Sequence, residues 1–183
     1  MNYIILDLEA TCWQGKALAP NETIEIGAVC INHQKQILGE FNQFIKPAQS
    51  DQLSDFCTEL TSITQEMVEN APYFPAAIQA FQHWIQSFGG DYLLCSWGKY
   101  DRNQFERDSK YHRLPIAWLK KHISLKHQYS DILGTRKRFG MKGALQKEGI
   151  PLTGTHHRGI DDAKNIAQIF LAHFGKWQHP VLK

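Results

Sequence analysis

The feature that most restricts the fold of this chain is a pair of acidic residues at the end of its first apolar segment. Tyr3-Ile4-Ile5-Leu6 is followed by Asp7 and Glu9, with one residue between the two carboxylates. Side chains at positions i and i+2 of a β-strand point to the same face, so both carboxylates leave the strand together. Two like charges this close repel each other unless a cation lies between them, and hard divalent cations take oxygen ligands. The segment therefore predicts a strand that ends in half of a metal site.

Two later segments supply further acidic residues and histidines. A D-x-E pair alone is common and is also compatible with a solvated strand end. In the second segment, a strand-like stretch over 91–95 leads through a glycine to Asp101. In the third, THHRGIDD (155–162), a glycine-punctuated loop carries two histidines and enters a helix through two aspartates. Together, the three segments favour a convergent set of four carboxylates over a solvated strand end.

The order of the predicted elements indicates the fold class. Strands are expected over 2–9, 23–31 and 37–45 with short connections, which predicts a three-strand antiparallel meander, and a fourth strand is expected over 91–96. Helices are expected at 65–68, 75–88, 101–112, 131–139, 142–148 and 162–173. A doubly wound nucleotide fold would alternate from the start, and no dinucleotide or P-loop motif is present. We therefore expect an α/β protein with a ribonuclease-H-like fold, in which helices flank a mixed central sheet.

Length and composition fit a single domain over residues 1–183. Apolar residues make up 43% of the chain, which is enough for a substantial core. No stretch approaches the ~20 apolar residues of a membrane span, and Asp7 lies too near Met1 to leave room for a signal peptide. The four cysteines form no C-x-x-C pair, so buried free thiols are expected. We expect a cytoplasmic protein with no membrane and no obligate protein partner.

Charge is distributed unevenly along the chain. Residues 1–97 hold 3 Lys/Arg and 11 Asp/Glu, a balance of −8, whereas residues 98–183 hold 17 Lys/Arg and 7 Asp/Glu, a balance of +10. Such asymmetry suits a polyanion that lies across a basic surface and reaches an acidic, metal-binding centre. A solvated basic face that pairs with the acidic half is equally compatible with these numbers.

Four carboxylates at one place define a chemistry. Asp7, Glu9, Asp101 and one aspartate at the start of the last helix are the number needed for two divalent cations. Two Mg²⁺ or Mn²⁺ ions held ~3.5–4 Å apart by such a set catalyse in-line phosphoryl displacement. A nearby histidine could take a proton from the attacking water, because its ordinary pKa of about 6.5 suits reaction near neutrality.

At these motifs the chain resembles the DEDDh 3′–5′ exonucleases of the DnaQ-like group. The first motif is Asp7-x-Glu9, the second ends in Asp101, and the third is H-x-x-x-x-D. Similarity to the Eri-like exonucleases, which include the histone-mRNA 3′-end enzyme, is carried by LDLEATCW, FCTELTSITQEMVENAP, CSWGKYDRNQF and HRGIDDAKNIAQI, between residues 6 and 169. The resemblance implies a metal-dependent exonuclease that releases nucleoside 5′-monophosphates from single-stranded 3′ ends, with RNA favoured over DNA.

Spacing alone leaves two registers open in the third motif. Four residues separate His156 from Asp161, and four also separate His157 from Asp162. The family pattern places the histidine directly before R-G or C-G and the aspartate before a small residue. The resemblance therefore favours His157 as general base and Asp162 as the fourth metal ligand. Asp161 is then expected to be the N-cap or a first-turn acid of the last helix, and His156 to be directed away from the attacking water.

The resemblance also implies where the terminal nucleotide lies. The residues expected to border it are Ala10, Thr11, Leu60, Thr61, Ile63 and Trp97. Ala10 and Thr11 would contribute through their backbone amides, and Glu9 would also contact the 3′-hydroxyl. Trp97 is a candidate stacking surface for a base, although core packing is equally compatible with Trp97 and with Ile63.

Two other functions are compatible with the same fold. A non-catalytic RNA-binding scaffold is disfavoured because such a module has no need for four convergent carboxylates. A DNA-directed, proofreading-type exonuclease is disfavoured because its similarity to this chain covers only the acidic motifs. A titration with Mg²⁺ or Mn²⁺ distinguishes the scaffold from a metal-dependent exonuclease. Digestion of matched RNA and DNA strands distinguishes a DNA-directed exonuclease from one that favours RNA.

Overall fold

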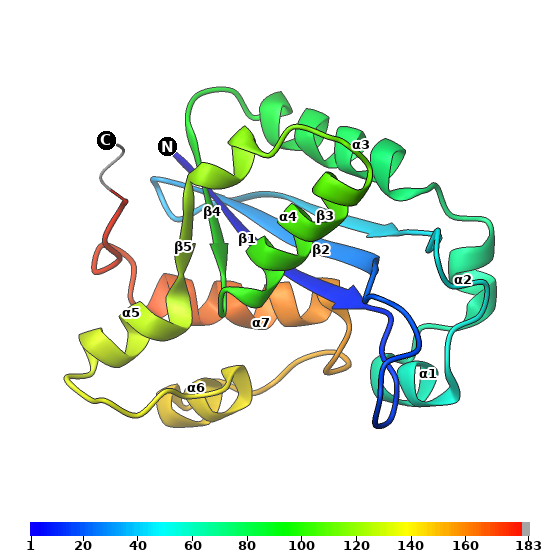
Figure 1. Ribbon diagram of the computed structural model, residues 1–183. Coiled ribbons are helices and arrows are strands. Elements are labelled where there is room, and N and C mark those ends of the chain that lie inside the picture. Colours follow the sequence, from blue (N-terminus) through cyan, green and yellow to red (C-terminus); the bar gives the residue numbers. More distant parts are fainter. Residues whose placement is uncertain (181–183) are drawn as a thin grey trace.

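A mixed five-stranded sheet lies at the centre of the computed structural model, which describes residues 1–180. The strands are β1 (Asn2–Ala10), β2 (Thr23–Asn32), β3 (Ile37–Phe44), β4 (Tyr92–Ser96) and β5 (His122–Ser124). Their order is β3-β2-β1-β4-β5, with antiparallel pairing from β3 to β1 and parallel pairing from β1 to β5. The predicted mixed sheet with its antiparallel meander is therefore confirmed (Figure 1).

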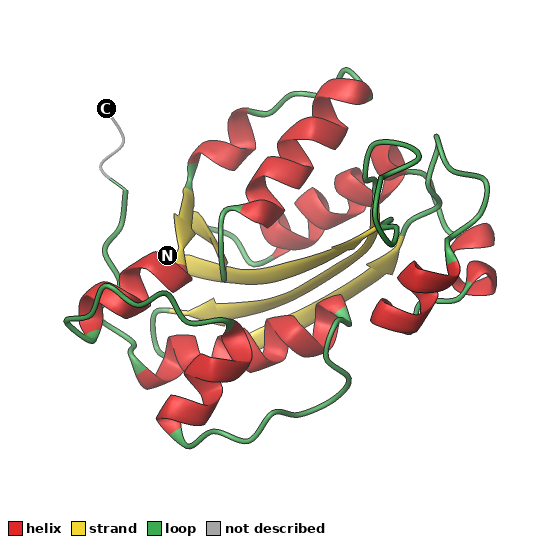
Figure 2. Cartoon of the chain, turned by 60° about the horizontal axis from the view of Figure 1, so that its bottom comes forward, coloured by secondary structure: helices red, strands yellow, loops and turns green. Residues whose placement is uncertain are grey.

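Helices cover both faces of the sheet (Figures 1 and 2). One face carries α3 (Phe74–Ser87), α4 (Tyr100–Tyr111) and the 3-10 turn η1 (Ala117–Lys120). The other carries α5 (Leu125–Ile132), α6 (Met141–Glu148) and α7 (Gly159–Ala172). Two short helices, α1 (Asp55–Thr61) and α2 (Gln65–Glu69), pack against the start of β2 in a small separate cluster. None of the helices within 1–180 is long and apolar enough to cross a bilayer.

Alternation along β1 decides which side chains meet which helices. Leu6 and Leu8 pack into the core beneath α3 and α4. Ile5 points to the opposite face and packs with residues of α5, α6 and α7. Because side chains alternate along a strand, Asp7 and Glu9 continue the series of Ile5 and emerge on the side of α7. The expectation that both carboxylates share one face is confirmed.

A close backbone contact seats the start of α7 on the sheet. Gly27 lies opposite Asp7 in the pairing of β1 with β2. A Cβ atom at Gly27 would lie 2.0 Å from the carbonyl carbon of Gly159 and 2.1 Å from the amide nitrogen of Ile160. Only glycine fits there, because backbone atoms occupy the space that a side chain would need. The first turn of α7 is therefore held at the level of Asp7.

Two of the helical predictions need correction. A helix over 131–139 is wrong, because α5 ends at Ile132 and Gly134 follows with a left-handed φ of +64°. The true start of α5 at Leu125 and the strand β5 before it were not predicted. A strand of three residues is too short to show a periodic pattern of apolar residues. The helix α1 was also missed. Ser54 begins it by accepting a hydrogen bond from the Cys57 amide at 3.0 Å.

Candidate active site

Four carboxylates meet at the carboxyl end of β1. Asp7 and Glu9 come from β1 and Asp162 from the first turn of α7, and oxygen atoms of these three side chains lie within 4.8 Å of one another. Asp101 comes from the first turn of α4, and its Oδ1 accepts a hydrogen bond from the Leu8 amide at 3.2 Å. Glu9, Asp101 and Asp162 are only 8%, 5% and 5% exposed. Three separate chain segments therefore place acidic groups around one point.

Burial raises the pKa of three of these carboxyls, and the charges of neighbouring acids raise it further for Asp7 and Glu9. Burial, followed by the charges of Asp162 and Glu25, raises the pKa of Glu9 to about 8. Burial raises the pKa of Asp101 to about 6. Burial, followed by the charges of Asp101 and Glu9, raises the pKa of Asp7 well above its ordinary range. An oxygen-only donor set whose charges repel one another fits a hard divalent cation, because the cation favours the charged form of each ligand.

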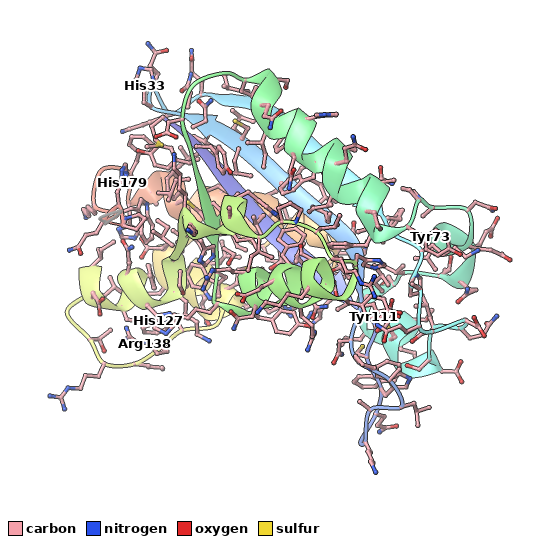
Figure 3. The ribbon with its side chains drawn as sticks, turned by 45° about the horizontal axis from the view of Figure 1, so that its top comes forward. His33, Tyr73, Tyr111, His127, Arg138 and His179 are labelled. Carbon is pink, nitrogen blue, oxygen red and sulfur yellow. The ribbon has the colours of Figure 1, made fainter. Side chains whose placement is uncertain are left out.

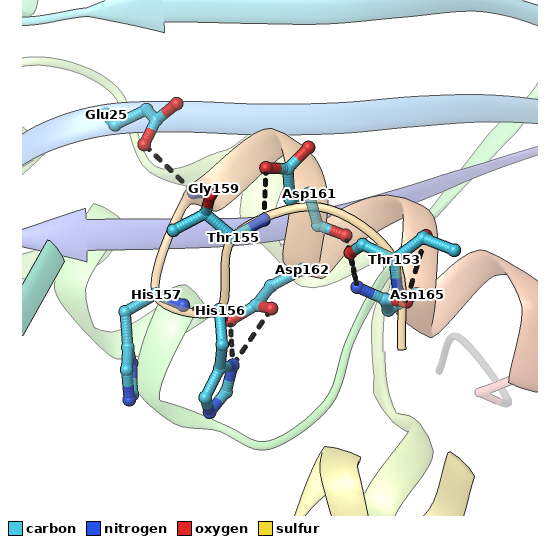
Figure 4. A network of polar contacts seen from close by, with 9 residues as sticks. All are labelled: Glu25, Thr153, Thr155, His156, His157, Gly159, Asp161, Asp162 and Asn165. Carbon is cyan, nitrogen blue, oxygen red and sulfur yellow. Dashed lines mark hydrogen bonds and ion pairs between the residues drawn. The ribbon is translucent and has the colours of Figure 1, made fainter. Parts of the chain in front are cut away.

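The structure separates the two registers of the third motif (Figure 4). The Oδ2 atom of Asp161 accepts a hydrogen bond from the Thr155 amide at 2.8 Å, and its carboxylate lies against Gly154. Asp161 is thus a first-turn acid of α7 that closes the preceding loop. Asp162 is the aspartate that joins Asp7 and Glu9.

Both histidines of the loop face the same cavity. The Nδ1 atom of His156 lies 3.0 and 2.9 Å from the two carboxylate oxygens of Asp162. The backbone amide of His157 donates to Asp162 Oδ2 at 3.1 Å, and the two imidazole rings lie 3.9 Å apart (Figure 4). The prediction that His156 is directed away is therefore wrong. A left-handed φ of +65° at His157 turns the chain, so both rings fall on one side.

Two residues that the sequence analysis did not single out hold this loop. Glu25 is fully buried and lies opposite Glu9 in the pairing of β1 with β2. Its carboxylate accepts a hydrogen bond from the Gly159 amide at 2.9 Å and pairs with the Arg158 guanidinium through two contacts of 3.2 Å. The signal for Glu25 was a charged residue within an otherwise apolar strand, since buried carboxylates are rare without a partner.

A cavity of about 340 Å³ opens over the carboxylates. Apart from the acids and histidines, its wall includes Ala10, Leu60, Trp97, Tyr100 and Met141. Its size lies within the range of small-molecule sites and is suited to one nucleotide. Tyr100, which the sequence analysis missed, is 51% exposed at the rim. Its signal was an aromatic residue directly before Asp101 in a polar stretch.

Three of the predicted substrate-binding residues line this cavity, namely Ala10, Leu60 and Trp97. Trp97 is also part of the core, because its ring packs on Tyr129 at 5.7 Å and its Nε1 donates to the Phe139 carbonyl at 3.0 Å. Trp97 therefore lines the cavity with one part of its surface and packs in the core with another.

The other three predicted residues do not reach the cavity. Thr61 and Ile63 are fully buried where α1 meets α2, and the Thr61 hydroxyl donates to the Cys57 carbonyl at 2.8 Å. The predicted contacts of these two residues with a base are wrong, because the last residue of α1 and the turn that follows it both direct their side chains into the protein. The Thr11 amide donates to the Glu22 carbonyl at 2.8 Å. That amide pairs within the protein and is not free for a nucleotide, which corrects the predicted role of Thr11.

We expect the metal-free protein to lose stability as the pH rises from 6.5 to 8. Glu9 has a folded pKa of about 8, above the unfolded value near 4.5, so its contribution is lost as the pH rises towards 8. Asp7 acts in the same direction. The lowered pKa values of His122 and His157 act with the opposite sign, but only below about 6.5.

Urea unfolding in the presence of a chelator measures this effect. One such group contributes a slope of up to about 1.4 kcal/mol per pH unit. Glu9→Gln should flatten the slope over the same interval, and added Mg²⁺ should reverse it by favouring the charged carboxylates. A free energy of unfolding that is constant or rises between pH 6.5 and 8 would show that the pKa values of these acids are not raised.

Comparison with known proteins agrees with this geometry. Residues 4–170 match the RNase_T family model, described as Exonuclease. ERI1 exoribonuclease 2 of Danio rerio is 34% identical over 186 residues, which cover 90% of this chain and 33% of the relative. 3′-5′ exoribonuclease 1 of Mus musculus is 35% identical over 174 residues, which cover 90% of this chain and 50% of the relative. The chain thus spans a third to a half of the length of these relatives.

A solved structure is similar over nearly its whole length. The nuclease domain of 3′hExo, a DEDDh family member, bound to rAMP, superimposes with a TM-score of 0.91 at 30% identity, covering 98% of this chain and 96% of that one. The cell-death related nuclease CRN-4, at 22% identity and a TM-score of 0.85, shares the fold. The predicted ribonuclease-H-like exonuclease fold is confirmed. This chain therefore belongs to the RNase_T exonuclease family and, within it, to the DEDDh group that the 3′hExo nuclease domain represents.

Proposed function

We propose that this protein is a metal-dependent 3′–5′ exonuclease that releases nucleoside 5′-monophosphates from single-stranded 3′ ends, with RNA favoured over DNA. The observation that carries the proposal is the meeting of four carboxylates beneath a cavity suited to one nucleotide. Several relatives are named 3′-5′ exoribonuclease, and one related solved complex is titled for 3′-end specific recognition of a histone mRNA stem-loop. These names support RNA as the substrate.

The carboxylates of Asp7, Glu9, Asp101 and Asp162 would hold two divalent cations, Mg²⁺ or Mn²⁺. Such ions, when bound, make a water more acidic and stabilise charge on the attacking and departing oxygens. Glu9 would also contact the 3′-hydroxyl, and its position in the cavity wall beside Ala10 supports this role. The wall residues Leu60 and Tyr100 offer apolar surface for the terminal base.

His157 is the proposed general base. Burial, followed by the charge of His156, lowers the pKa of His157. The ring is therefore neutral at neutral pH and is able to accept a proton from the attacking water. The left-handed turn at His157 and the bond from its amide to Asp162 hold the ring at the mouth of the cavity. The loop is fixed in turn by Glu25 and Arg158.

A non-catalytic scaffold is disfavoured on energetic grounds. Burying several carboxylates within a few ångströms is unfavourable, as the raised pKa values of Asp7 and Glu9 indicate. A scaffold would gain stability by replacing these acids, because removing mutual repulsion costs it no function. Retention of the full set is explained by metal-dependent catalysis. A DNA-directed exonuclease would use the same acids and differs in substrate alone.

Digestion of matched RNA and DNA oligonucleotides with single-stranded 3′ overhangs tests the proposal. With Mg²⁺ or Mn²⁺, we expect nucleoside 5′-monophosphates to be released from the 3′ end, faster from RNA than from DNA. A strand blocked at its 3′-hydroxyl should resist digestion. Metal binding without hydrolysis of either strand would support the scaffold, and faster digestion of DNA would support the DNA-directed alternative.

We expect the basic loop over 133–140 to set affinity for long strands without setting turnover. Phe139 anchors the loop to the cavity wall through Trp97, and Arg136 and Lys137 are exposed on it. Arg138 is unsuited to the test, because its guanidinium pairs with Asp131 at 3.3 Å and donates to the carbonyl of neighbouring His127 (Figure 3).

Arg136→Glu with Lys137→Glu should weaken binding of a long single strand and flatten its salt dependence by about 1.4 in logarithmic slope, about 0.7 for each lost phosphate contact. A dinucleotide, too short to reach the loop, should be cleaved nearly as before. Lys35→Glu with Lys120→Glu is the matched control, because it makes the same change of charge at two exposed lysines near the end of the sheet where β1 begins. Equal losses on both substrates would show that the loop does not contact the strand.

A further inference from the structure

The loop before α7 and the first turn of α7 carry a second set of metal-ligating atoms, which includes His156, a residue without a role in the proposed reaction. His156, His157 and Asp162 each offer one ligand atom, and these three atoms lie within 4.8 Å of one another. Asp162 belongs both to this group and to the group that it forms with Asp7 and Glu9. The two groups therefore compete for one carboxylate.

The donor atoms of the two groups differ in kind. Asp7, Glu9 and Asp162 offer only oxygen, which suits Mg²⁺ and Mn²⁺. The histidine group offers two imidazole nitrogens and one carboxylate oxygen. Mg²⁺ rarely takes nitrogen ligands, whereas Zn²⁺ and its late first-row neighbours bind imidazole strongly. Three protein ligands with one open position are also the usual arrangement in zinc sites that are not closed structural ones.

We propose that His156, His157 and Asp162 bind a late first-row divalent cation, represented by Zn²⁺, and that this ion inhibits hydrolysis. Binding of the ion depends only on the geometry of the loop. Inhibition rests on the proposed function, because the ion withdraws the general base His157 and the shared ligand Asp162 from the reaction.

The loop is close to the geometry that such an ion needs. In a tetrahedral zinc site, ligand distances near 2.0–2.2 Å place a nitrogen and an oxygen roughly 3.4 Å apart. His156 Nδ1 and Asp162 Oδ2 are 2.9 Å apart in the structure. To hold a metal ion between them, the pair has to open by only about half an ångström.

The surroundings also favour binding. The backbone that carries the ligands is fixed, since Glu25 holds Arg158 and Gly159, and Asp161 closes the loop at Thr155. The site is open to solvent, because the His156 side chain is 25% exposed. An ion can therefore enter without unfolding the loop, and little conformational freedom remains to be lost when it binds.

Calorimetric titration of the metal-free protein with Zn²⁺ tests the site. Wild type should bind one Zn²⁺ at this loop, and His156→Gln should weaken binding by about ten-fold or more. Glutamine keeps a donor for Asp162 but lacks the imidazole, and loss of even an outer-shell partner costs about 10–100-fold in metal affinity. His33→Ala removes an exposed histidine at the opposite end of the sheet and is the matched control (Figure 3). Co²⁺ absorption reports nitrogen ligation directly.

Two further measurements distinguish the site from the carboxylate centre and from the proposed function. Asp7→Asn should keep the Zn²⁺ affinity. Loss of affinity in Asp7→Asn with retention in His156→Gln would place the ion among the carboxylates and overturn the inference. With saturating Mg²⁺, the Zn²⁺ concentration for half inhibition should rise about ten-fold or more in His156→Gln, relative to its own zinc-free rate. An inactive wild type would refute the proposed function, whereas the calorimetry would still decide the site.

Discussion

Asp7→Asn is expected to abolish hydrolysis while the fold survives. Asp7 lies at the centre of the acidic group, since the charges of Asp101, Glu9 and Asp162 all act on it. An asparagine keeps the size of the side chain but supplies only one neutral oxygen to a cation. The variant should therefore lose Mg²⁺ affinity and its activity together. Hydrolysis of a single-stranded RNA and calorimetry with Mg²⁺ measure both effects.

The stability of the same variant should be unchanged or raised without metal. The folded pKa of Asp7 is raised, so the ionised carboxylate destabilises the metal-free protein at neutral pH. An uncharged amide removes this repulsion, and the melting temperature in a chelator should not fall. In Mg²⁺ the order should reverse, because only wild type gains stability from the ion.

Asp161→Asn is the matched control for this variant. It makes the same chemical change one residue before Asp162, in the other register of the motif. Its amide oxygen is still able to accept the hydrogen bond from Thr155, so the loop should persist. Activity close to wild type is expected. Substantial hydrolysis by Asp7→Asn, or its loss in Asp161→Asn, would contradict the assignment of the acids.

The arrangement of Asp7 and Glu9 could be predicted from the sequence because it depends only on the local periodicity of a strand. Asp7 and Glu9 share a face because a strand repeats every two residues, and this holds wherever the strand packs. Asp162 differs, because two aspartates and two histidines with equal spacing are indistinguishable from spacing alone. A contact between Gly27 and Gly159, which are 132 residues apart in the sequence, places Asp162 beside Asp7.

The incorrect predictions depend on single backbone angles and on packing between distant segments. His156 faces the site because one residue, His157, adopts a left-handed φ, which histidine rarely does and which no pattern reveals. Thr61 and Ile63 are buried because the end of α1 and the turn after it pack against the start of β2, and α1 was not predicted. Tertiary contacts fix these features, so residue order alone was insufficient.

His157→Ala is expected to lower the rate of hydrolysis by about 10²–10⁴, the usual loss for a general base. Mg²⁺ affinity should be nearly unchanged, because the Asp162 bond comes from the backbone amide of His157 and survives the substitution. Calorimetry with Mg²⁺ separates this result from that of Asp7→Asn, in which affinity and rate are lost together.

The pH dependence identifies the group. Burial lowers the pKa of His157, so the neutral ring should persist below the ordinary value of about 6.5. The acidic limb of the wild-type pH–rate profile should contain this inflection, and His157→Ala should lack it. His156→Ala should lose about ten-fold at most, because it removes only the contact with Asp162. If the larger loss and the missing inflection belong to His156→Ala, the base is His156, whose ring already contacts the metal-binding carboxylate.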